Sequence, residues 1–252
     1  METLQEQINS LGPFAYWIAL FIVVGLFVTV GQGFLKARKI QPNSFQWAIF
    51  RHEVFWSITN LVVSAFVLGG LSQFLRTNGW ITFDQSPAEW WVILLEYALY
   101  FFAFDAYFYW GHRIMHIPGI YELIHKTHHR SMSPNLMTSV SVNPLESFVN
   151  GGFVPLFTAM FVVHQETFAL IAPTNIIMGV YVHNGYEFLP RWWNKSWITK
   201  WFITTTFHDQ HHRYFRGNYG GYTTLWDYAM GTVRPNYESG FEAVKKRTAA
   251  NK

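Results

Sequence analysis

The chain has 252 residues, 50% of them hydrophobic and 19% aromatic, and it carries no cysteine and a formal net charge of +3. Lys, Arg, Asp and Glu make up 13% of the chain, about half of the roughly 25% typical of soluble proteins, so the composition favours a membrane protein and excludes a disordered one. The absence of cysteine excludes a disulfide scaffold, Fe–S clusters and thiolate-ligated haem, and the basic residues are too scattered to indicate nucleic acid as a partner.

Apolar runs of membrane-spanning length follow one another along the chain. About 20 apolar residues in a helix cross the roughly 30 Å of hydrocarbon in a bilayer. The sequence predicts three long spans and a shorter helical hairpin, at residues 14–31, 54–75 and 90–110 and at residues 148–163 and 168–182. Pro155 and Pro173 interrupt the two short runs, so we expect the hairpin to cross only part of the membrane. No repeat or linker divides the sequence, and residues 1–252 are therefore predicted to form one all-α integral membrane domain.

Basic residues are concentrated on one predicted side of the membrane. If every segment crosses, all of the 18 Lys and Arg residues except Arg76 fall on the same side. Because basic loops are retained in the cytoplasm, this side is expected to be cytoplasmic, in a bacterial inner membrane or the endoplasmic reticulum.

Tryptophans recur at four-residue spacing after the predicted hairpin. Trp193, Trp197 and Trp201 would share one face of a helix over residues 191–207. Such a pattern predicts a helix that lies in the membrane interface, and an amphipathic helix packed on its own protein is the alternative.

Nine of the eleven histidines lie in four clusters, each at or just beyond the predicted cytoplasmic end of a span. The clusters are His112 and His116; His125, His128 and His129; His183; and His208, His211 and His212. Because residues i, i+3 and i+4 share a helical face, each cluster presents its imidazoles together. Neutral imidazoles are ligands for Fe, Zn or Cu, and nine are too many for one ion, so the pattern predicts two metals side by side. His183 has an alternative role as a hydrogen-bond donor behind a ligand.

Other metal patterns are weaker. Arg113 stands where an HExxH zinc protease has its catalytic Glu, and Glu122 gives the Glu-x-x-His pattern of soluble di-iron bundles once, without a second copy. His52 and His164 lie outside the clusters and are assigned no role.

The charged residues inside the third predicted span need an explanation, because carboxylates in lipid are costly. Asp105 lies seven residues before His112, within about 20° of the same helical face. We predict that it accepts a hydrogen bond from a ligand imidazole, and a helix–helix hydrogen bond is the alternative. Tyr109 lies on the same stripe and is a second supporting candidate, whereas Glu96 lies on the opposite face and receives no role.

The ordered motifs resemble the fatty acid hydroxylase/sterol desaturase superfamily of integral membrane di-iron oxidases. The resemblance rests on DAYFYWGHRIMH at 105–116, HKTHH at 125–129, HNGYEF at 183–188 and HDQHH at 208–212. The segment NYGGYTTLWDYAMGT at 218–232 resembles the one that follows the last box in sterol C5-desaturases and C4-methyl oxidases. Many sterol-modifying members have His-Pro before an acidic residue where this chain has Asn143-Pro144-Leu145-Glu146, so Asn143 leaves one position near the site more open and Glu146 is a supporting candidate.

The resemblance implies an O₂-dependent hydroxylase or desaturase that acts on a C–H bond of a membrane lipid, whether sterol-like, fatty acyl or carotenoid. Two iron ions would be held by the nine histidines, with zinc as a substitute in purified protein, in a cap built from residues 112–129 and 183–234. Without the His-Pro-Gly-Gly signature of a fused cytochrome b5, the electrons are expected from an external ferredoxin or cytochrome b5 type donor with its reductase. The alternative is a non-catalytic or transport-type metal-binding membrane protein, but a transport site would lie near mid-membrane rather than at one end.

Overall fold

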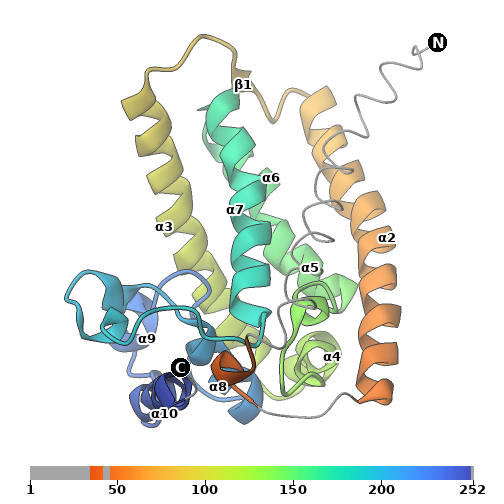
Figure 1. Cartoon of the computed structure of the whole chain (residues 1–252). Coiled ribbons are helices and arrows are strands. Elements are labelled where there is room, and N and C mark those ends of the chain that lie inside the picture. Colours follow the sequence, from red (N-terminus) through yellow and green to blue (C-terminus); the bar gives the residue numbers. More distant parts are fainter. Residues whose placement is uncertain (1–34, 42–45, 251–252) are drawn as a thin grey trace.

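The computed structural model describes residues 35–41 and 46–250, and helices dominate this part of the chain (Figure 1). The helices are η1 (Lys36–Arg38), α2 (Trp47–Thr77), α3 (Trp90–Met115), η2 (Tyr121–His125), α4 (Lys126–His129), η3 (Leu136–Ser139), α5 (Pro144–Gly151), α6 (Phe153–Met160), α7 (Gln165–His183), η4 (Trp193–Lys195), η5 (Thr199–Trp201), α8 (Thr205–Tyr214), α9 (Leu225–Ala229) and α10 (Tyr237–Ala250). The two short strands β1 (Phe83–Asp84) and β2 (Val163–His164) pair in parallel. The predicted helical class is confirmed for these residues, and the predicted span at 14–31 lies outside them.

The second and third predicted spans are the cores of two longer helices. Helix α2 contains residues 54–75 and helix α3 contains residues 90–110, and both are long and apolar enough to cross a membrane. At 1.5 Å per residue the 31 residues of α2 extend roughly 46 Å, more than the thickness of the hydrocarbon. Helix α2 ends at Thr77. Gly79 then adopts the left-handed conformation, with φ of 73°, and its backbone amide donates to the carbonyl of Arg76.

Helix α2 has its polar side inside and its apolar side outside. Its buried residues are Glu53, Ser57 and Asn60, which follow one another at four and three positions on one face. Phe55 and Phe66 on other faces are 61% and 78% exposed. A helix on the surface of a soluble protein shows the opposite arrangement, so this one is expected where lipid rather than water covers the outer face.

The predicted hairpin is divided more finely than expected. The run at 148–163 is split into α5 and α6 at Gly151 and Gly152, and α7 carries Pro173 within its 19 residues. Among the described helices, α2 and α3 pass the length and hydropathy test for a membrane span, and the hairpin helices do not. The interruption agrees with a segment that crosses part of a membrane.

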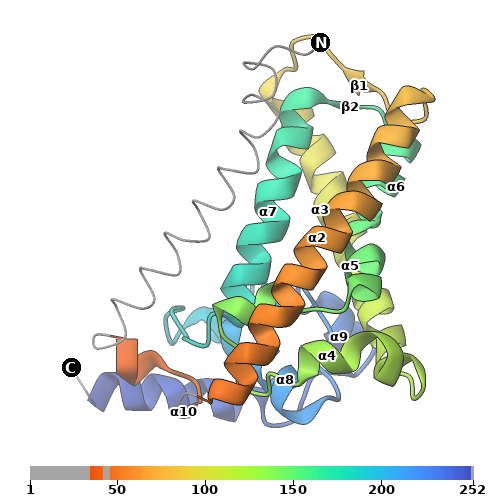
Figure 2. The same ribbon diagram turned by 90° about the vertical axis from the view of Figure 1, so that its right-hand side faces the viewer.

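An aromatic core packs α3 against α6 and α7. Tyr100 of α3 stands edge-on to Phe157 of α6, with ring centroids 5.3 Å apart, and Ile171 of α7 is fully buried beside them. The strands β1 and β2 lie at one end of this bundle, and α4, α8 and α10 lie at the other (Figure 2). The helical cap therefore sits at one end of the long helices.

The interfacial helix predicted over residues 191–207 is wrong. The segment instead forms the short turns η4 and η5, and α8 begins at Thr205. The hydroxyl of Thr199 donates to the carbonyl of Trp193 at 2.7 Å, and the backbone amides of Ile198 and Thr199 donate to the hydroxyl of Ser196. Such side-chain hydrogen bonds compete with the helical ladder. Trp197 is nevertheless 79% exposed.

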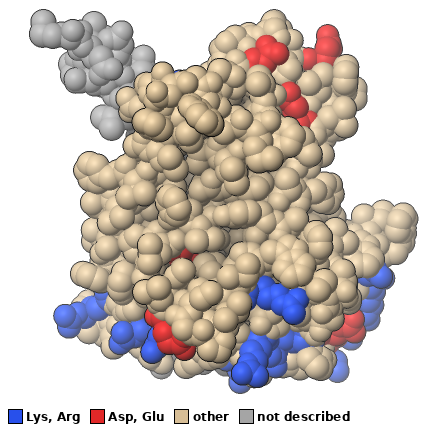
Figure 3. Space-filling model, turned by 180° about the vertical axis from the view of Figure 1, so that it is seen from behind, with Lys and Arg blue, Asp and Glu red and all other residues tan. Residues whose placement is uncertain are grey.

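Charge is distributed along the long axis of the molecule. Lys and Arg side chains gather at the capped end, and an acidic cluster marks the opposite end (Figure 3). This distribution agrees with the grouping of basic residues expected from the sequence.

Placing a charge on the outer face of α2 tests whether lipid covers it. In a membrane, Phe66→Lys at mid-helix is expected to cost about 2.5–3.5 kcal/mol and to lower the yield of inserted protein several-fold. Trp47→Lys, at the helix end and also exposed, is the matched control and should be tolerated. The measurement is the membrane-bound fraction and the thermal midpoint in detergent. Equal behaviour of the two variants would contradict a lipid-facing α2.

Candidate metal centre

The structure brings all nine predicted histidines together at the capped end, in two compact groups. In each group the candidate ligand nitrogens lie within 4.8 Å of one another. The first histidine group contains His112, His116, His125, His129 and His211. The second histidine group contains His128, His183, His208 and His212, so His183 takes a place among the candidate ligands rather than behind them.

Each HxxHH motif is divided between the two groups. In the segment η2–α4, His125 and His129 face the first group and His128 faces the second. In α8 the division is reversed, since His211 faces the first group while its neighbours at positions 208 and 212 face the second. Adjacent residues on a helix point about 100° apart, so one helical turn serves two centres. The prediction that each trio projects together is therefore correct only for its i and i+4 members.

Backbone carbonyls fix the orientation of several imidazoles. The Nδ1 atom of His112 lies 2.8 Å from the carbonyl oxygen of Tyr219, and that of His211 lies 2.9 Å from the carbonyl oxygen of Gly217. Because a carbonyl can only accept, each Nδ1 carries the proton and each Nε2 keeps a lone pair. His183 and His212 are held in the same way, by carbonyl oxygens at 2.7 and 3.0 Å.

The Nε2 atoms of neighbouring imidazoles converge on one another. The Nε2 atoms of His112 and His125 are 3.0 Å apart, and those of His208 and His183 are 2.9 Å apart. Imidazole nitrogens gathered this closely form a donor set that fits imidazole-binding metals such as Fe, Zn or Cu. These residues could hold two ions, one in each group.

Burial keeps the imidazoles neutral. Burial, followed by repulsion from neighbouring imidazoles, lowers the pKa of His125, His129 and His212 well below the ordinary value of about 6.5. A neutral ring is the form that binds a metal, so the site is prepared for ligation at neutral pH.

Of the four supporting candidates, Glu146 lies beside a histidine. Its Oε2 atom is 2.9 Å from the Nδ1 atom of His125, and its carboxyl is buried. Asn143, three residues earlier, instead caps α5 by accepting from the amide of Leu145 at 2.9 Å and donates to the carbonyl of Leu123. The more open position expected at Asn143 is thus occupied by a helix cap.

The predicted hydrogen bond from a ligand imidazole to Asp105 is wrong. The carboxylate accepts from the backbone amides of Tyr222 and Thr223 at 3.2 and 2.8 Å, and from the Thr223 hydroxyl. The loop before α9 supplies these donors, and the same loop presents the Tyr219 carbonyl to His112. Asp105 therefore contacts the loop that orients this imidazole rather than the imidazole itself. The Tyr109 hydroxyl likewise contacts Thr232, at 2.9 Å.

The remaining sequence candidates lie away from the groups, in the part of the chain that the structure describes. Glu122 accepts from the amide of Gly119 at the start of its turn, and His52 contacts the carbonyl of Thr127. His164 lies at the opposite end of the bundle, where its Nδ1 atom is 2.8 Å from a carboxylate oxygen of Glu96. Assigning no role to His52 and His164 agrees with these positions.

Glu53, which the sequence patterns did not single out, anchors a loop of the cap. Its buried carboxylate on α2 accepts from the side chains of Ser131, Asn135 and Thr138 at 2.7, 2.8 and 2.8 Å. The carbonyl of Ser131 in turn receives the Nδ1 proton of His212. The signal was present, because Glu53 begins the polar stripe on an otherwise apolar helix.

Two further buried carboxylates organise the loops of the cap. Asp227 accepts from the amides of Tyr219 and Gly220 at 2.9 and 2.7 Å. Glu187 accepts from the amide and hydroxyl of Thr206 at 2.9 and 2.7 Å, in the first turn of α8. Both side chains therefore position backbone that carries or orients histidines.

A helical bundle of membrane-protein composition, capped by two groups of buried imidazoles, defines a class of histidine-rich proteins with a metal-binding donor set. Within this class the chain belongs to the fatty acid hydroxylase family, whose model matches residues 97–232, more than half of its length.

Several curated proteins are similar to the chain. Methylsterol monooxygenase erg25B of Aspergillus fumigatus is 26% identical over 98% of this chain and 80% of that protein. Methylsterol monooxygenase 1 of Gallus gallus is 28% identical over 85% of this chain and 70% of that protein. The very-long-chain aldehyde decarbonylase GL1-11 of Oryza sativa subsp. japonica is 32% identical over 58% of this chain and 55% of that protein.

The matches differ in how much of each relative they cover. Methylsterol monooxygenase erg25A of Aspergillus fumigatus is 34% identical over 61% of this chain, and the matched part covers 50% of that relative's length. No solved structure matches the chain.

Removing the Glu53 carboxylate tests its role as an anchor. Glu53→Ala leaves the buried hydroxyls of Ser131 and Thr138 without their acceptor, at a cost of about 1–3 kcal/mol for each, and also removes the acceptor of the partly buried Asn135 amide, so the thermal midpoint in detergent should fall sharply. Glu53→Gln keeps one acceptor oxygen and should fall between Glu53→Ala and the unaltered chain. Glu166→Gln at the exposed start of α7 is the control. An unchanged midpoint in Glu53→Ala would refute the anchoring role.

The lowered pKa values predict an acid-sensitive metal-free protein. Below about pH 6.5 these imidazoles take up protons in the unfolded chain but stay neutral in the folded one, because their folded-state pKa is lowered. The free energy of unfolding is therefore complete at pH 8 and falls by about 1.4 kcal/mol per pH unit for each such ring as the pH drops below about 6.5. Burial raises the pKa of Asp209 to about 7 and also raises that of Glu146, and these two carboxyls act in the opposite sense. Because the histidines outnumber these carboxyls, the thermal midpoint of the metal-free protein should decrease as the pH is lowered from 7 to 5. A midpoint that rises over this interval would show that the carboxyls dominate.

Proposed function

We propose that the chain is an O₂-dependent oxidoreductase that uses two iron ions to oxidise a C–H bond of a membrane lipid. The observation that carries this proposal is the division of both HxxHH motifs between two adjacent groups of buried imidazoles. One ion would not require this arrangement, whereas two adjacent ions acting on one O₂ molecule would. The family match and the names of the relatives, which are monooxygenases and an aldehyde decarbonylase, support lipid oxidation.

The reaction balances as a mixed-function oxidation. The lipid R–H, O₂, two electrons and two protons give R–OH and H₂O, and removal of a second hydrogen from the lipid in place of hydroxyl addition gives a double bond and two waters. Bound iron would supply the electron transfer to O₂ and the activation of the C–H bond. The protein's part is to hold the ligands, to place the lipid and to exclude bulk water.

The residues beside the imidazoles would tune this centre. The carbonyls of Tyr219 and Gly217 hold Nδ1 protons and so direct the Nε2 lone pairs inward. The Glu146 carboxyl, whose Oε2 atom lies 2.9 Å from Nδ1 of His125, would help to fix the orientation of that ring. Neutral imidazoles leave the positive charge of the ions uncompensated, and a buried carboxylate at this distance would offset part of it.

We propose a sterol-like substrate that reaches the centre from the bilayer. Several relatives are named methylsterol monooxygenases, and the segment 218–232 resembles the corresponding part of sterol-modifying enzymes. Exposed apolar residues of α3, such as Phe102 at 57% exposed, would offer such a lipid an apolar surface along this helix. Fatty acyl lipids and carotenoids are the competing substrates.

The capped end is proposed to face the cytoplasm. The basic side chains gather there, which is the arrangement that cytoplasmic loops show (Figure 3). An external ferredoxin or cytochrome b5 type carrier with its reductase would then supply electrons to this face.

A non-catalytic or transport-type metal-binding protein is the competing function. The position of both histidine groups at one end of the long helices, rather than midway along them, disfavours a transport path (Figure 2). A protein that binds zinc and stays inert to dithionite and O₂ would favour the non-catalytic alternative.

Substitution of one histidine from each group tests the proposal. His211→Ala in the first group and His128→Ala in the second should each lower product formation by at least about 100-fold, because ligands of one centre act as a unit. His52→Ala is the control, since it removes a histidine that lies outside both groups. The readout is mass spectrometry of lipids from cells with and without the chain, in which one lipid should gain an oxygen atom or lose two hydrogen atoms. Full activity of both variants would refute the site assignment.

A further inference from the structure

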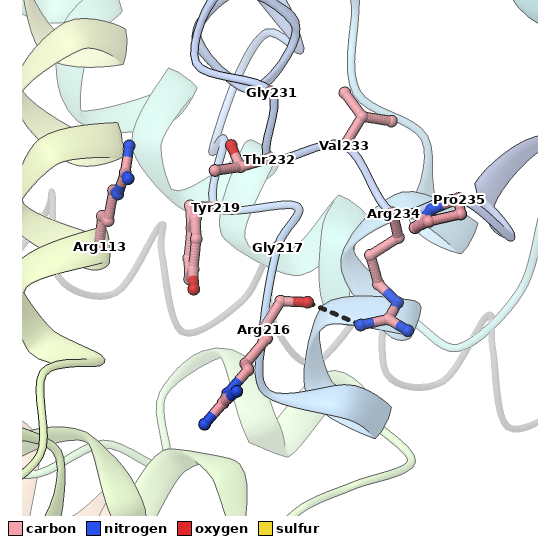
Figure 4. A pocket seen from close by; sticks show the side chains of 9 residues that line it. All are labelled: Arg113, Arg216, Gly217, Tyr219, Gly231, Thr232, Val233, Arg234 and Pro235. Carbon is pink, nitrogen blue, oxygen red and sulfur yellow. Dashed lines mark hydrogen bonds between the residues drawn. The ribbon is translucent and has the colours of Figure 1, made fainter.

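A pocket of about 270 Å³ opens at the capped end beside the first histidine group (Figure 4). The charged residues that line it are Arg113, Arg216 and Arg234, from the end of α3 and from the loops on either side of α9. Arg213, one turn before Arg216, is also exposed. The charged residues that line the pocket are therefore all basic.

Two residues in the wall of the pocket accept hydrogen bonds from imidazoles of the first histidine group. Gly217 and Tyr219 line it, and their carbonyl oxygens accept from His211 and His112 at 2.9 and 2.8 Å. The ring of Tyr219 lies 5.2 Å from the ring of His116, which is the half-buried member of its group. This wall is a short bonded route from the molecular surface to the first histidine group.

The arginines are arranged for a broad partner rather than for a small anion. Their guanidinium groups point apart in the close view instead of converging on one point (Figure 4). Arg234 donates to the carbonyl of Arg216 at 2.8 Å and lies over the ring of Tyr214, while Arg113 donates to the hydroxyl of Tyr109 at 3.2 Å. A single phosphate or carboxylate cannot bridge groups held apart in this way, whereas an extended acidic surface can face all of them.

We propose that this arginine-rimmed pocket is the docking surface for an acidic, soluble one-electron carrier. The proposal rests on the proposed function, which requires two electrons for each lipid oxidised. In each docking event the carrier would lose one electron to the ions that the histidines would hold, so two events would supply the two electrons of one turnover, and the two protons would come from solvent. Opposite charge would steer the carrier to the wall formed by Gly217 and Tyr219.

Charge reversal at the rim tests the docking surface. Arg216→Glu changes an exposed side chain but leaves the backbone carbonyl that Arg234 uses. Arg51→Glu is the matched control, because Arg51 is an exposed arginine at the start of α2 and the change in net charge is the same. The probes are a reduced plant-type [2Fe–2S] ferredoxin and a reduced soluble cytochrome b5 domain, mixed with the iron-loaded full chain in a stopped-flow instrument without O₂.

The oxidation of each carrier is followed by its own absorbance, at several chloride concentrations. For at least one carrier, Arg216→Glu should lower the second-order rate constant by about tenfold or more at low salt and flatten its salt dependence. Arg51→Glu should behave like the unaltered chain. Dithionite, which needs no docking surface, should reduce the centre of all three proteins equally.

Other outcomes would overturn the proposal. Equal rate constants and salt dependence in Arg216→Glu and Arg51→Glu would do so, as would oxidation of neither carrier by an unaltered chain that dithionite reduces. Inhibition by inorganic phosphate beyond that of chloride at equal ionic strength would also contradict it, because it would indicate a small-anion site. A centre that dithionite cannot reduce would instead contradict the proposed function itself, so the two failures are distinguishable.

Discussion

The hydrogen bonds from Nδ1 atoms of buried imidazoles to backbone carbonyls are the interaction on which the rest of the structure depends. They direct Nε2 atoms towards neighbouring imidazole nitrogens about 3 Å away, for example that of His112 towards that of His125, and so gather nitrogen donors where a cation can bind. Each carbonyl must therefore be held rigidly, and the cap does this with loops whose other polar groups are satisfied by buried carboxylates.

Glu53 holds the loop that presents Ser131 to His212, and Asp105 together with Asp227 holds the loop that presents Tyr219 to His112. A fully satisfied polar network in a low-dielectric interior is rigid, and a partly satisfied one is costly. Two of these carboxylates, Glu53 and Asp105, lie on the long helices α2 and α3. The bundle and the histidine groups are thus tied together by side chains that bind no histidine themselves.

The parts that could be predicted from the sequence are those encoded by local spacing. The i, i+4 pairs predict which histidines lie together, and long apolar runs predict α2 and α3. The division of each HxxHH motif between two groups could not be predicted, because it depends on how the π-helical turn η2 and helix α8 face each other. The partners of Glu53 are 78 to 85 residues away along the chain, so nothing local identifies them. The tryptophan spacing at 193–201 was misleading, since hydrogen bonds to the Ser196 hydroxyl and from the Thr199 hydroxyl compete with the helical hydrogen bonds that it implied.

The proposal that the nine histidines hold two iron ions is tested most directly by metal quantification combined with X-ray absorption of the purified, unaltered chain. We expect about two iron ions for each chain, with a coordination sphere dominated by imidazole nitrogens and an absorption edge that shifts on addition of dithionite and again on exposure to O₂. A single ion per chain, or zinc that responds to neither reagent, would contradict it.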